Sequence, residues 1–319
     1  MAHQVSPRAL ETMRTYHNQV RALHPHLERL FKSWRLLMSA HHNFTFSSAQ
    51  QAYITQKIYG QLKSWGISAY KDDVSSHIDS PQNARIVNAD STMLNTSKSE
   101  WVIRCWLDFN GELEMTKSPL NFDYVGCLRS VASVQLPLNQ YLPQNAKHDQ
   151  RHEWNTLAQQ LDVDELLLCD AMGMVLESHN SNFWLLECHA QLDELLFKRR
   201  LLNRDPQALR DTYWVTPPLD GSCLPGITRS MLVQLFEDAG AQVYFERVDL
   251  KIPQKYHEKH ESTVEDVTHD YYLSSTLKSF SPISSIDHCV LQRPVWDQEL
   301  CAWVDDQLST HHLWGHLKR

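Results

Sequence analysis

The 319-residue chain lacks the features that mark several large classes of protein. It has no run approaching the ~18 consecutive apolar residues of a membrane span. Residues 1–4 begin no basic-then-apolar signal pattern, so we expect a cytoplasmic protein with no membrane partner. The seven cysteines form no C-x-x-C pair and no regular spacing. Such a scattered set indicates free thiols in a reducing compartment rather than a disulfide framework.

Charge and histidine spacing argue against two further kinds of partner, nucleic acids and metal ions. A formal net charge of -8 argues against a nucleic-acid surface. The histidines that gather in polar stretches show no H-E-x-x-H or cysteine-paired spacing, so we expect no metal site. These are His257, His260, His269, His311, His312 and His316. The composition, 42% apolar and 21% charged, is enough for a packed core in one large domain or two.

The most informative stretch runs from residue 164 to residue 187. Leu166 to Cys169 is a short apolar run bounded by turn formers, which predicts a buried strand. Asp170 to Gly173 predicts a turn, and the next strand ends at the carboxylate Glu177. Phe183 to Leu186 predicts a third strand. A carboxylate at the end of a buried strand, before a tight polar bend, has no evident stabilising purpose and indicates a functional role.

The elements around this stretch alternate between helices and strands. Strands are predicted at 10–14, 101–109 and 243–248, with one or two more within 124–138 and two short ones within 271–283. A hairpin turn at Asn110-Gly111 is predicted to lead into a return strand from Glu112. Helices are predicted from Pro25 to Met38, from Ser47 or Ser48 to Gly66, and at 148–161, 227–239 and 296–308. Three polar or charged stretches, near 72–100, 191–210 and 251–267, interrupt this order and are predicted to be insertions.

Three blocks of sequence together resemble one known family, the class IV (fold-type IV) pyridoxal-phosphate (PLP) enzymes. The first is D-x-x-G followed by E and N, here Asp170, Gly173, Glu177 and Asn182. The second is T-P-P…L-P-G-I-T-R, here Thr216-Pro217-Pro218 and Leu224 to Arg229. The third is E-T-x-R…H-L-x-R-L-x-x-S, matched by Glu11, Thr12, Arg14, His26, Leu27, Arg29, Leu30 and Ser33. The family includes branched-chain and D-amino-acid aminotransferases and aminodeoxychorismate lyase.

The resemblance implies a fold and a partner. The fold class is α/β (α+β): two domains of the D-amino-acid aminotransferase type, with PLP in the cleft between them. The expected division gives an N-terminal α/β domain, residues 1–142, and a C-terminal PLP-binding domain, residues 143–319. Pro137 and Pro143 bracket the expected connection. Members of the family are usually at least dimeric, so we expect a homodimer that acts on a small molecule.

The same resemblance implies roles for individual residues. Lys147, the single lysine between Lys117 and Lys198, matches the lysine that binds the cofactor covalently and moves a proton. Glu177 matches the carboxylate that faces the pyridine nitrogen. Phosphate contacts are implied for Arg29, Gly226, Ile227, Thr228, Ser275 and Thr276. A planar guanidinium and a helix N-terminus are both suited to phosphate. Asn182 is expected to tie its bend to the backbone, and His152 is a candidate for a position where some aminotransferases carry a tyrosine.

Two reactions and one silent alternative remain open. Ser274-Ser275-Thr276, followed by Ser281-Pro282-Ile283, is similar to the aminotransferase form of that loop and favours an amino acid as substrate. Lys147-His148 with Arg151 is similar to the K-H-x-N-R of aminodeoxychorismate lyase, and the hairpin from Arg104 to Gly111 also looks lyase-like. These features favour a chorismate-derived substrate. A catalytically silent binding protein on the same fold is disfavoured because the lysine, glutamate, arginine and G-I-T residues all occur together.

Overall fold

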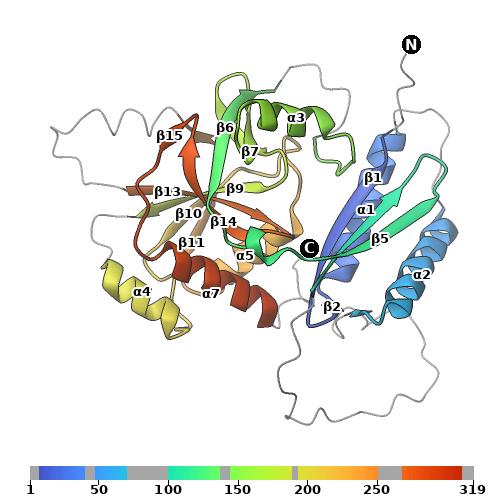
Figure 1. Cartoon of the computed structure of the whole chain (residues 1–319), viewed down its shortest axis with the longest axis horizontal. Helices are drawn as coiled ribbons and strands as arrows, with labels where there is room; N and C mark the ends of the chain where they lie inside the picture. Colours follow the sequence, from blue (N-terminus) through green and yellow to red (C-terminus); the bar gives the residue numbers. More distant parts are fainter. Residues whose placement is uncertain are drawn as a thin grey trace, which may run out of the picture.

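A computed structural model describes residues 7–39, 47–69, 100–136, 144–188, 193–250 and 268–310. The described chain forms two β-sheets, each covered by helices (Figure 1). The mixture of sheets and helices confirms the expected fold class. Of the three expected insertions, the one near 191–210 contains a helix, α4 (Glu194–Leu202). Nearly all of the stretch near 72–100, all of 251–267, and Pro137 and Pro143 lie outside the described residues.

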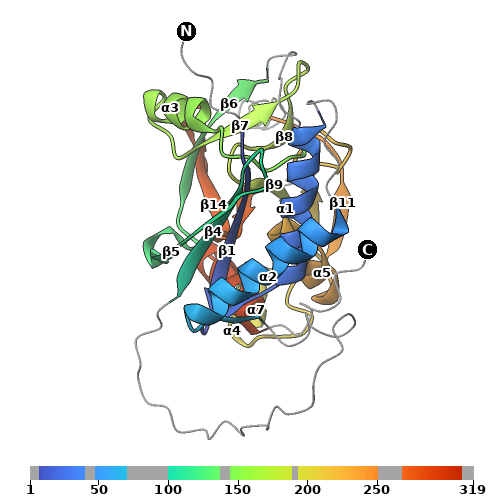
Figure 2. The ribbon, with the colours of Figure 1, turned by 90° about the vertical axis from the view of Figure 1, so that its right-hand side faces the viewer.

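The smaller sheet is built from the first part of the chain. Its strand order is β3-β2-β1-β4-β5. The strands are β1 (Ala9–Tyr16), β2 (Gln19–Val20), β3 (Ser68–Ala69), β4 (Trp101–Leu107) and β5 (Leu113–Pro119). Helices α1 (Leu23–Met38) and α2 (Ser48–Ser64) cover one face of this sheet (Figure 2). The core between them is apolar and holds Met13, Leu30, Trp34, Ile58 and Ile103, among others.

Local sequence explains where these two helices begin and end. Pro25 lies in the first turn of α1, where a proline removes no helical hydrogen bond. Ser47 and Gln50 form a capping box at the start of α2, in which each side chain accepts from the other residue's backbone N–H. Gly66 follows the end of α2 with a φ of 72°, a conformation that favours glycine. The predicted ends of both helices are therefore close to the observed ones.

The larger sheet contains the stretch that carries the D-x-x-G…E motif. Its order is β11-β10-β9-β13-β14-β6-β7-β8-β12, and β15 pairs with β14. The strands are β6 (Arg129–Gln135), β7 (Glu165–Cys169), β8 (Met174–Ser178), β9 (Asn182–Cys188), β10 (Tyr213–Thr216), β11 (Gln242–Phe245), β12 (Val248–Asp249), β13 (Thr268–Ser275), β14 (Ser279–Ile286) and β15 (Cys289–Val290). The predicted succession of strand, turn, strand and strand from 165 to 188 is confirmed.

Aromatic side chains fill the core of the larger part. Trp184, Trp214, Phe236, Tyr272 and Phe280 are fully buried and pack edge-on, tilted or stacked against one another. They belong to a cluster that joins the sheet to α4, α5 (Ile227–Asp238) and the closing helix α7 (Asp297–Thr310). A short helix, α3 (His152–Gln160), packs with β6 and β7 in a separate small cluster.

Helix α7 ties the larger part to the smaller sheet. The Arg14 guanidinium, on β1, lies 2.7 Å from Asp305 of α7 and 2.8 Å from Glu100. Arg21 donates to the carbonyl of Ser309, 2.8 Å away. These contacts fix the two parts beside each other. The expected domain division after residue 142 stays a prediction; β6, which precedes it, belongs to the larger sheet.

One predicted helix starts later than the sequence indicated. The helix expected from His148 begins at His152. The residues before it run alongside β1, since the Leu10 N–H donates to the Lys147 carbonyl over 3.0 Å and the Asp149 N–H donates to the Arg8 carbonyl over 3.1 Å. This pairing holds Lys147 in an extended segment. The prediction was wrong here because the partner strand is more than 130 residues away in sequence.

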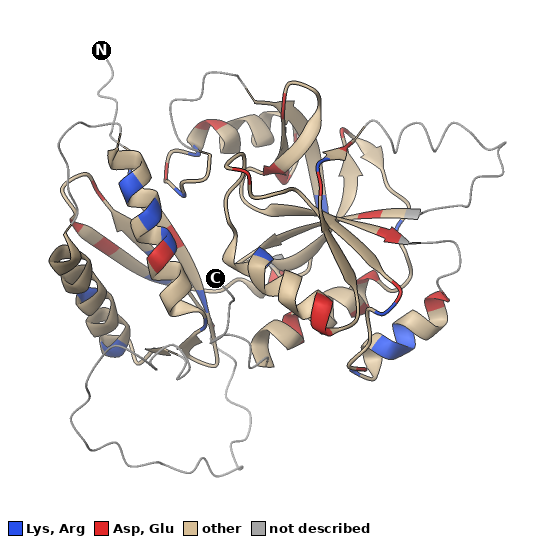
Figure 3. Cartoon of the chain, turned by 180° about the vertical axis from the view of Figure 1, so that it is seen from behind, with Lys and Arg blue, Asp and Glu red and all other residues tan. Residues whose placement is uncertain are grey.

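Charge is distributed without segregation between the two parts. Both parts carry basic and acidic residues, with several basic positions along α1 (Figure 3). Among the described helices, none combines the length and the apolar character that a membrane span requires. In the described residues no group of three or more His, Cys, Asp and Glu side chains is arranged to hold a metal ion. His257, His260, His311, His312 and His316 lie outside those residues.

Candidate active site

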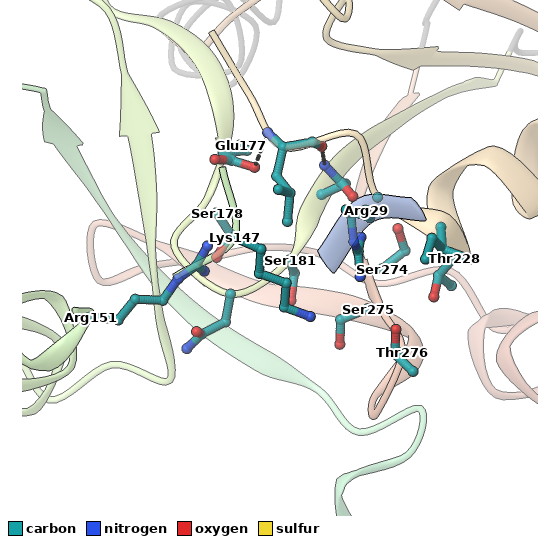
Figure 4. Close-up of a pocket in the computed structure, with 15 residues that line it drawn as sticks. Arg29, Lys147, Arg151, Glu177, Ser178, Ser181, Thr228, Ser274, Ser275 and Thr276 are labelled. Carbon is teal, nitrogen blue, oxygen red and sulfur yellow. Dashed lines mark hydrogen bonds between the residues drawn. The ribbon is translucent and has the colours of Figure 1, made fainter. Parts of the chain in front are cut away.

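All eight residues predicted for the site line one pocket between the two parts of the chain (Figure 4). They are Arg29, Lys147, Glu177, Gly226, Ile227, Thr228, Ser275 and Thr276. The pocket is also lined by Arg151, Ser178, Asn180, Ser181, Asn182, Leu224 and Ser274. Helix α1 of the smaller part contributes Arg29, and the rest of the lining comes from four later segments, 147–151, 177–182, 224–228 and 274–276. Residues that are up to 247 positions apart in sequence therefore meet around one space.

Lys147 lies at the wall of the pocket and is held through its backbone. Its N–H donates to the Ser33 hydroxyl of α1 over 2.9 Å. Its Nζ lies 3.4 Å from Oε1 of Glu11, and the side chain is 15% exposed. Burial lowers the pKa of Lys147 to about 8; Arg29 and Arg151 act in the same direction and Glu11 opposes them. Near neutral pH roughly a tenth of such an amine is uncharged and able to act as a nucleophile or base.

Arg29 projects from α1 beside that lysine. Its Nε donates to Oε2 of Glu11 over 2.8 Å, and its Nη2 donates to Oε1 of Glu11 over 2.6 Å. Its Nη1 donates to the carbonyl of Pro225, 3.3 Å away. Because a guanidinium has five N–H groups, these bonds leave one on each terminal nitrogen. That remaining edge is a two-pronged donor suited to a phosphate or carboxylate.

The start of α5 lies next to this arginine. Gly226 is the N-cap residue, and no side chain caps the helix, so the first-turn N–H groups remain for a ligand. The positive end of the helix dipole adds to an anion's attraction. The residues Thr228, Ser275 and Thr276 also line this region of the pocket and carry hydroxyl groups. One end of the pocket is thus built to bind an anion.

The loop before α5 is held in place by Asn182. Its Nδ2 donates to the carbonyl of Leu224 over 3.0 Å, which confirms the expectation that Asn182 ties its bend to the backbone. Gly226 packs directly against this side chain: a Cβ added to Gly226 would lie 1.8 Å from the Asn182 Oδ1 atom. The family-like glycine is therefore required by close contact, since its φ of -69° is open to other residues.

Glu177 occupies another wall of the pocket, at the end of β8. Its Oε2 accepts a hydrogen bond of 3.0 Å from the Leu224 N–H. The side chain is buried, and burial raises the pKa of Glu177 to about 7, although Arg151, the Leu224 N–H and Arg29 oppose this rise. The raised pKa means that the positive charges near Glu177 do not fully stabilise its ionised form. A protonated ring nitrogen placed beside it would favour its ionised form.

Arg151 is the pocket residue that the sequence identified only as a cue for one reaction. Its Nη1 donates to the carbonyl of His179, and its guanidinium acts electrostatically on Glu177. In Figure 4 it lies on the side of the pocket away from Thr228 and Thr276. His152, the candidate for a tyrosine position, is exposed and does not line the pocket.

Sequence reasoning missed the support of the bend after Glu177. The fully buried Glu165 of β7 accepts from the hydroxyls of Ser178 and Ser181, the second over 3.1 Å. It also pairs with Lys278, which follows Thr276 by two residues. One buried carboxylate therefore joins two of the pocket's loops. Glu165 directly precedes the apolar run Leu166 to Cys169 and gave no signal of this role in the sequence.

The arrangement combines three chemical functions in one space. An amine of lowered pKa lies between an anion-binding end and a buried carboxyl group. Such a set can hold a phosphorylated cationic heterocycle and place a nucleophilic amine and base against it.

Comparison with a family model supports this interpretation. Residues 114–286 match the model described as amino-transferase class IV. This match covers more than half of the chain. A search of curated proteins finds no match.

Several solved structures share the fold at low sequence identity. A hypothetical aminotransferase from Mycobacterium tuberculosis, in a PLP-bound form, is 14% identical, with a TM-score of 0.62 and coverage of 94% of this chain and 88% of that chain. A branched-chain aminotransferase from Thermoproteus uzoniensis, with norvaline, is 17% identical, with a TM-score of 0.61 and coverage of 95% and 86%. The Escherichia coli branched-chain amino acid aminotransferase is 15% identical, with a TM-score of 0.61 and coverage of 98% and 90%.

Proposed function

This chain belongs to the class IV aminotransferases, and from that membership we propose that it is a PLP-dependent enzyme that transfers an amino group between an amino acid and a keto acid. The observation that carries the proposal is the meeting of Lys147, Arg29, Glu177 and the start of α5 around one pocket. Each of these groups matches one part of the cofactor: its phosphate, its ring nitrogen or its aldehyde.

The residues present fit pyridoxal phosphate. The phosphate would be held by the free edge of Arg29, by N–H groups at the start of α5, and by hydroxyls of Thr228, Ser275 and Thr276. Glu177 would face the ring nitrogen, and the raised pKa of that carboxyl fits a site that is completed by a cation. Lys147 would form the covalent link to the cofactor. When bound, the cofactor supplies an aldehyde for amines and a ring that takes up electrons released at the substrate's α-carbon.

Residues of the chain would perform the other parts of the reaction: controlling protonation, transferring the proton and positioning the cofactor. Ionised Glu177 would keep the ring nitrogen protonated, which would favour electron withdrawal into the ring. Lys147, once freed by the substrate amine, would accept at its Nζ the proton released from the substrate's α-carbon. It would return a proton to the cofactor's former aldehyde carbon, which lies on the other side of the amine nitrogen. Its lowered pKa keeps a useful fraction of this amine neutral. Arg29 and the start of α5 would hold the cofactor in one position, so that Lys147 could reach both of these carbon atoms.

A second candidate, aminodeoxychorismate lyase, is favoured by one observation. Arg151 lines the pocket close to Lys147 and Glu177, and the K-H…R spacing is the part of the sequence that is similar to the lyase. A lyase would form pyruvate and 4-aminobenzoate from aminodeoxychorismate and would regenerate the aldehyde form of the cofactor in each cycle. We prefer the aminotransferase because Ser274, Ser275 and Thr276, all in the pocket, are similar to the aminotransferase form of their loop.

A single-turnover experiment separates the two reactions. The holoenzyme is mixed with individual D- and L-amino acids in the absence of any keto acid, and the cofactor spectrum and released keto acid are measured. An aminotransferase converts its cofactor from aldehyde to amine and releases one keto acid per site. The preferred proposal is wrong if no amino acid of either hand does this while aminodeoxychorismate yields pyruvate and 4-aminobenzoate.

The proposal extends to the setting of the enzyme. We propose a cytoplasmic homodimer with an amino acid as its small-molecule substrate, in line with the free cysteines among the described residues and the usual assembly of the family. Sedimentation of the purified holoenzyme tests the dimer. A monomer that retains full activity would contradict it.

A further inference from the structure

Glu11 is a buried carboxylate that faces the pocket's cations without lining the pocket itself. It lies on β1, and its side chain is 1% exposed. Four donors surround its oxygens: the Thr12 N–H at 2.8 Å, His26 Nδ1 at 3.0 Å, and the Nε and Nη2 atoms of Arg29 at 2.8 and 2.6 Å. With so many short bonds, this carboxylate is fixed in place.

Lys147 is the fifth and weakest partner of Glu11. Its Nζ lies 3.4 Å from Oε1, longer than the contacts made by Arg29 or His26. The pocket exposes 15% of the lysine side chain, whereas Glu11 is closed off from solvent. The lysine can therefore leave this contact while the carboxylate stays behind. The geometry is that of a fixed acceptor and a movable donor.

The charges around Lys147 explain why the contact is weak. Arg29 neutralises Glu11, and burial lowers the pKa of His26, which favours an uncharged imidazole that donates a hydrogen bond. Arg29 and Arg151 repel the lysine ammonium, and Glu11 is the charge that attracts it. Glu11, whose charge is partly neutralised by Arg29, therefore attracts the Lys147 amine. The attraction is too weak to prevent the ammonium group from releasing its proton.

We propose that Glu11 is a positioning residue that receives the amine of Lys147 whenever this lysine is not bound to the cofactor. The contact keeps Nζ at the pocket wall during the steps in which the lysine acts as a base, and ready to rejoin the cofactor. The inference rests on the role proposed for Lys147 and adds a partner for its free form. Glu11 acts through Lys147 and touches no reacting atom.

The test measures the proton affinity of Lys147 in the cofactor-free protein. Brief acetylation with acetic anhydride is performed across a pH series, and modification of Lys147 is quantified by peptide mass spectrometry. In Glu11→Gln, the pH of half-maximal reactivity is expected to fall by about one unit or more, because an adjacent carboxylate favours the ammonium form by this amount. Glu11→Asp keeps the carboxylate but on a shorter side chain. It is expected to give a smaller shift of this pH in the same direction.

Glu165→Gln provides the matched control. Glu165 is also a fully buried strand carboxylate paired with a lysine, Lys278, but it makes no contact with Lys147. Glu165→Gln should lower the free energy of unfolding without shifting the pH dependence of Lys147 acetylation. If Glu11→Gln does not fold, Glu11→Asp alone decides the matter. An unshifted profile in the folded variants overturns the inference, whereas a failed functional proposal would appear separately as a cofactor adduct on another lysine.

Discussion

Glu177 accepts a 3.0 Å hydrogen bond from the backbone N–H of Leu224, so the carboxylate at the end of β8 is joined to the loop that begins α5. Asn182 binds the carbonyl of the same leucine, also over 3.0 Å. Two of the three sequence blocks that carried the family resemblance therefore meet at one residue. This junction places the acidic wall of the pocket at a fixed distance from its anion-binding end.

Arg29→Ala is expected to weaken binding of pyridoxal phosphate by about 1.5–3 kcal/mol, the range for hydrogen bonds to charged groups. The loss should be specific to the phosphate, because the free edge of this guanidinium is placed beside the start of α5. Titration of the cofactor-free variant with pyridoxal phosphate and with pyridoxal measures this directly. Equal losses for the two ligands would show that Arg29 serves only the structure.

Gly226→Ala is expected to destabilise the protein by about 1–3 kcal/mol, the usual cost of overpacking. The new Cβ would lie 1.8 Å from the Asn182 Oδ1 atom, so this side chain or the loop must move. Urea unfolding gives the magnitude. Gly60→Ala is the matched control, since a Cβ there meets nothing within 4 Å.

A double variant identifies the clash at Gly226 as the cause. Removing the Asn182 side chain as well should make Gly226→Ala less costly than it is alone. If the losses in free energy of unfolding for the two single variants simply add up in the double variant, the clash with Asn182 is not the cause of the destabilisation in Gly226→Ala.

Glu177→Gln should change how stability depends on pH. Burial raises the pKa of Glu177 to about 7, from an ordinary value of 4.5. The folded cofactor-free protein then binds more protons than the unfolded chain between these values, so this group's contribution falls as pH rises from about 4.5 to 7. The glutamine variant is neutral throughout and should gain stability relative to the wild type across that window. Parallel stability curves from pH 4.5 to 8 would contradict the assignment.

Local patterns predicted most elements because their signals lie within a few residues. The apolar spacing of α1, the capping box of Ser47 and the turn at Gly173 are examples. The family motifs identified eight site residues from the sequence, and in the structure all eight line one pocket.

Contacts between distant segments were not predictable in this way. The pairing of Lys147 with Leu10, the Ser33 hydroxyl that accepts its N–H, and Glu165 joining two loops all depend on tertiary packing. Glu11 and Ser33 were matched in a motif, but their partners became evident only from the fold.

The central claim is that Lys147 carries the cofactor. Borohydride reduction of the holoenzyme, followed by proteolysis and mass spectrometry, locates the covalent link. We expect the reduced cofactor on the peptide that contains Lys147, and no reduced adduct in Lys147→Ala that has been incubated with pyridoxal phosphate. A stoichiometric adduct on any other lysine, or an unchanged yield in the variant, would contradict the account.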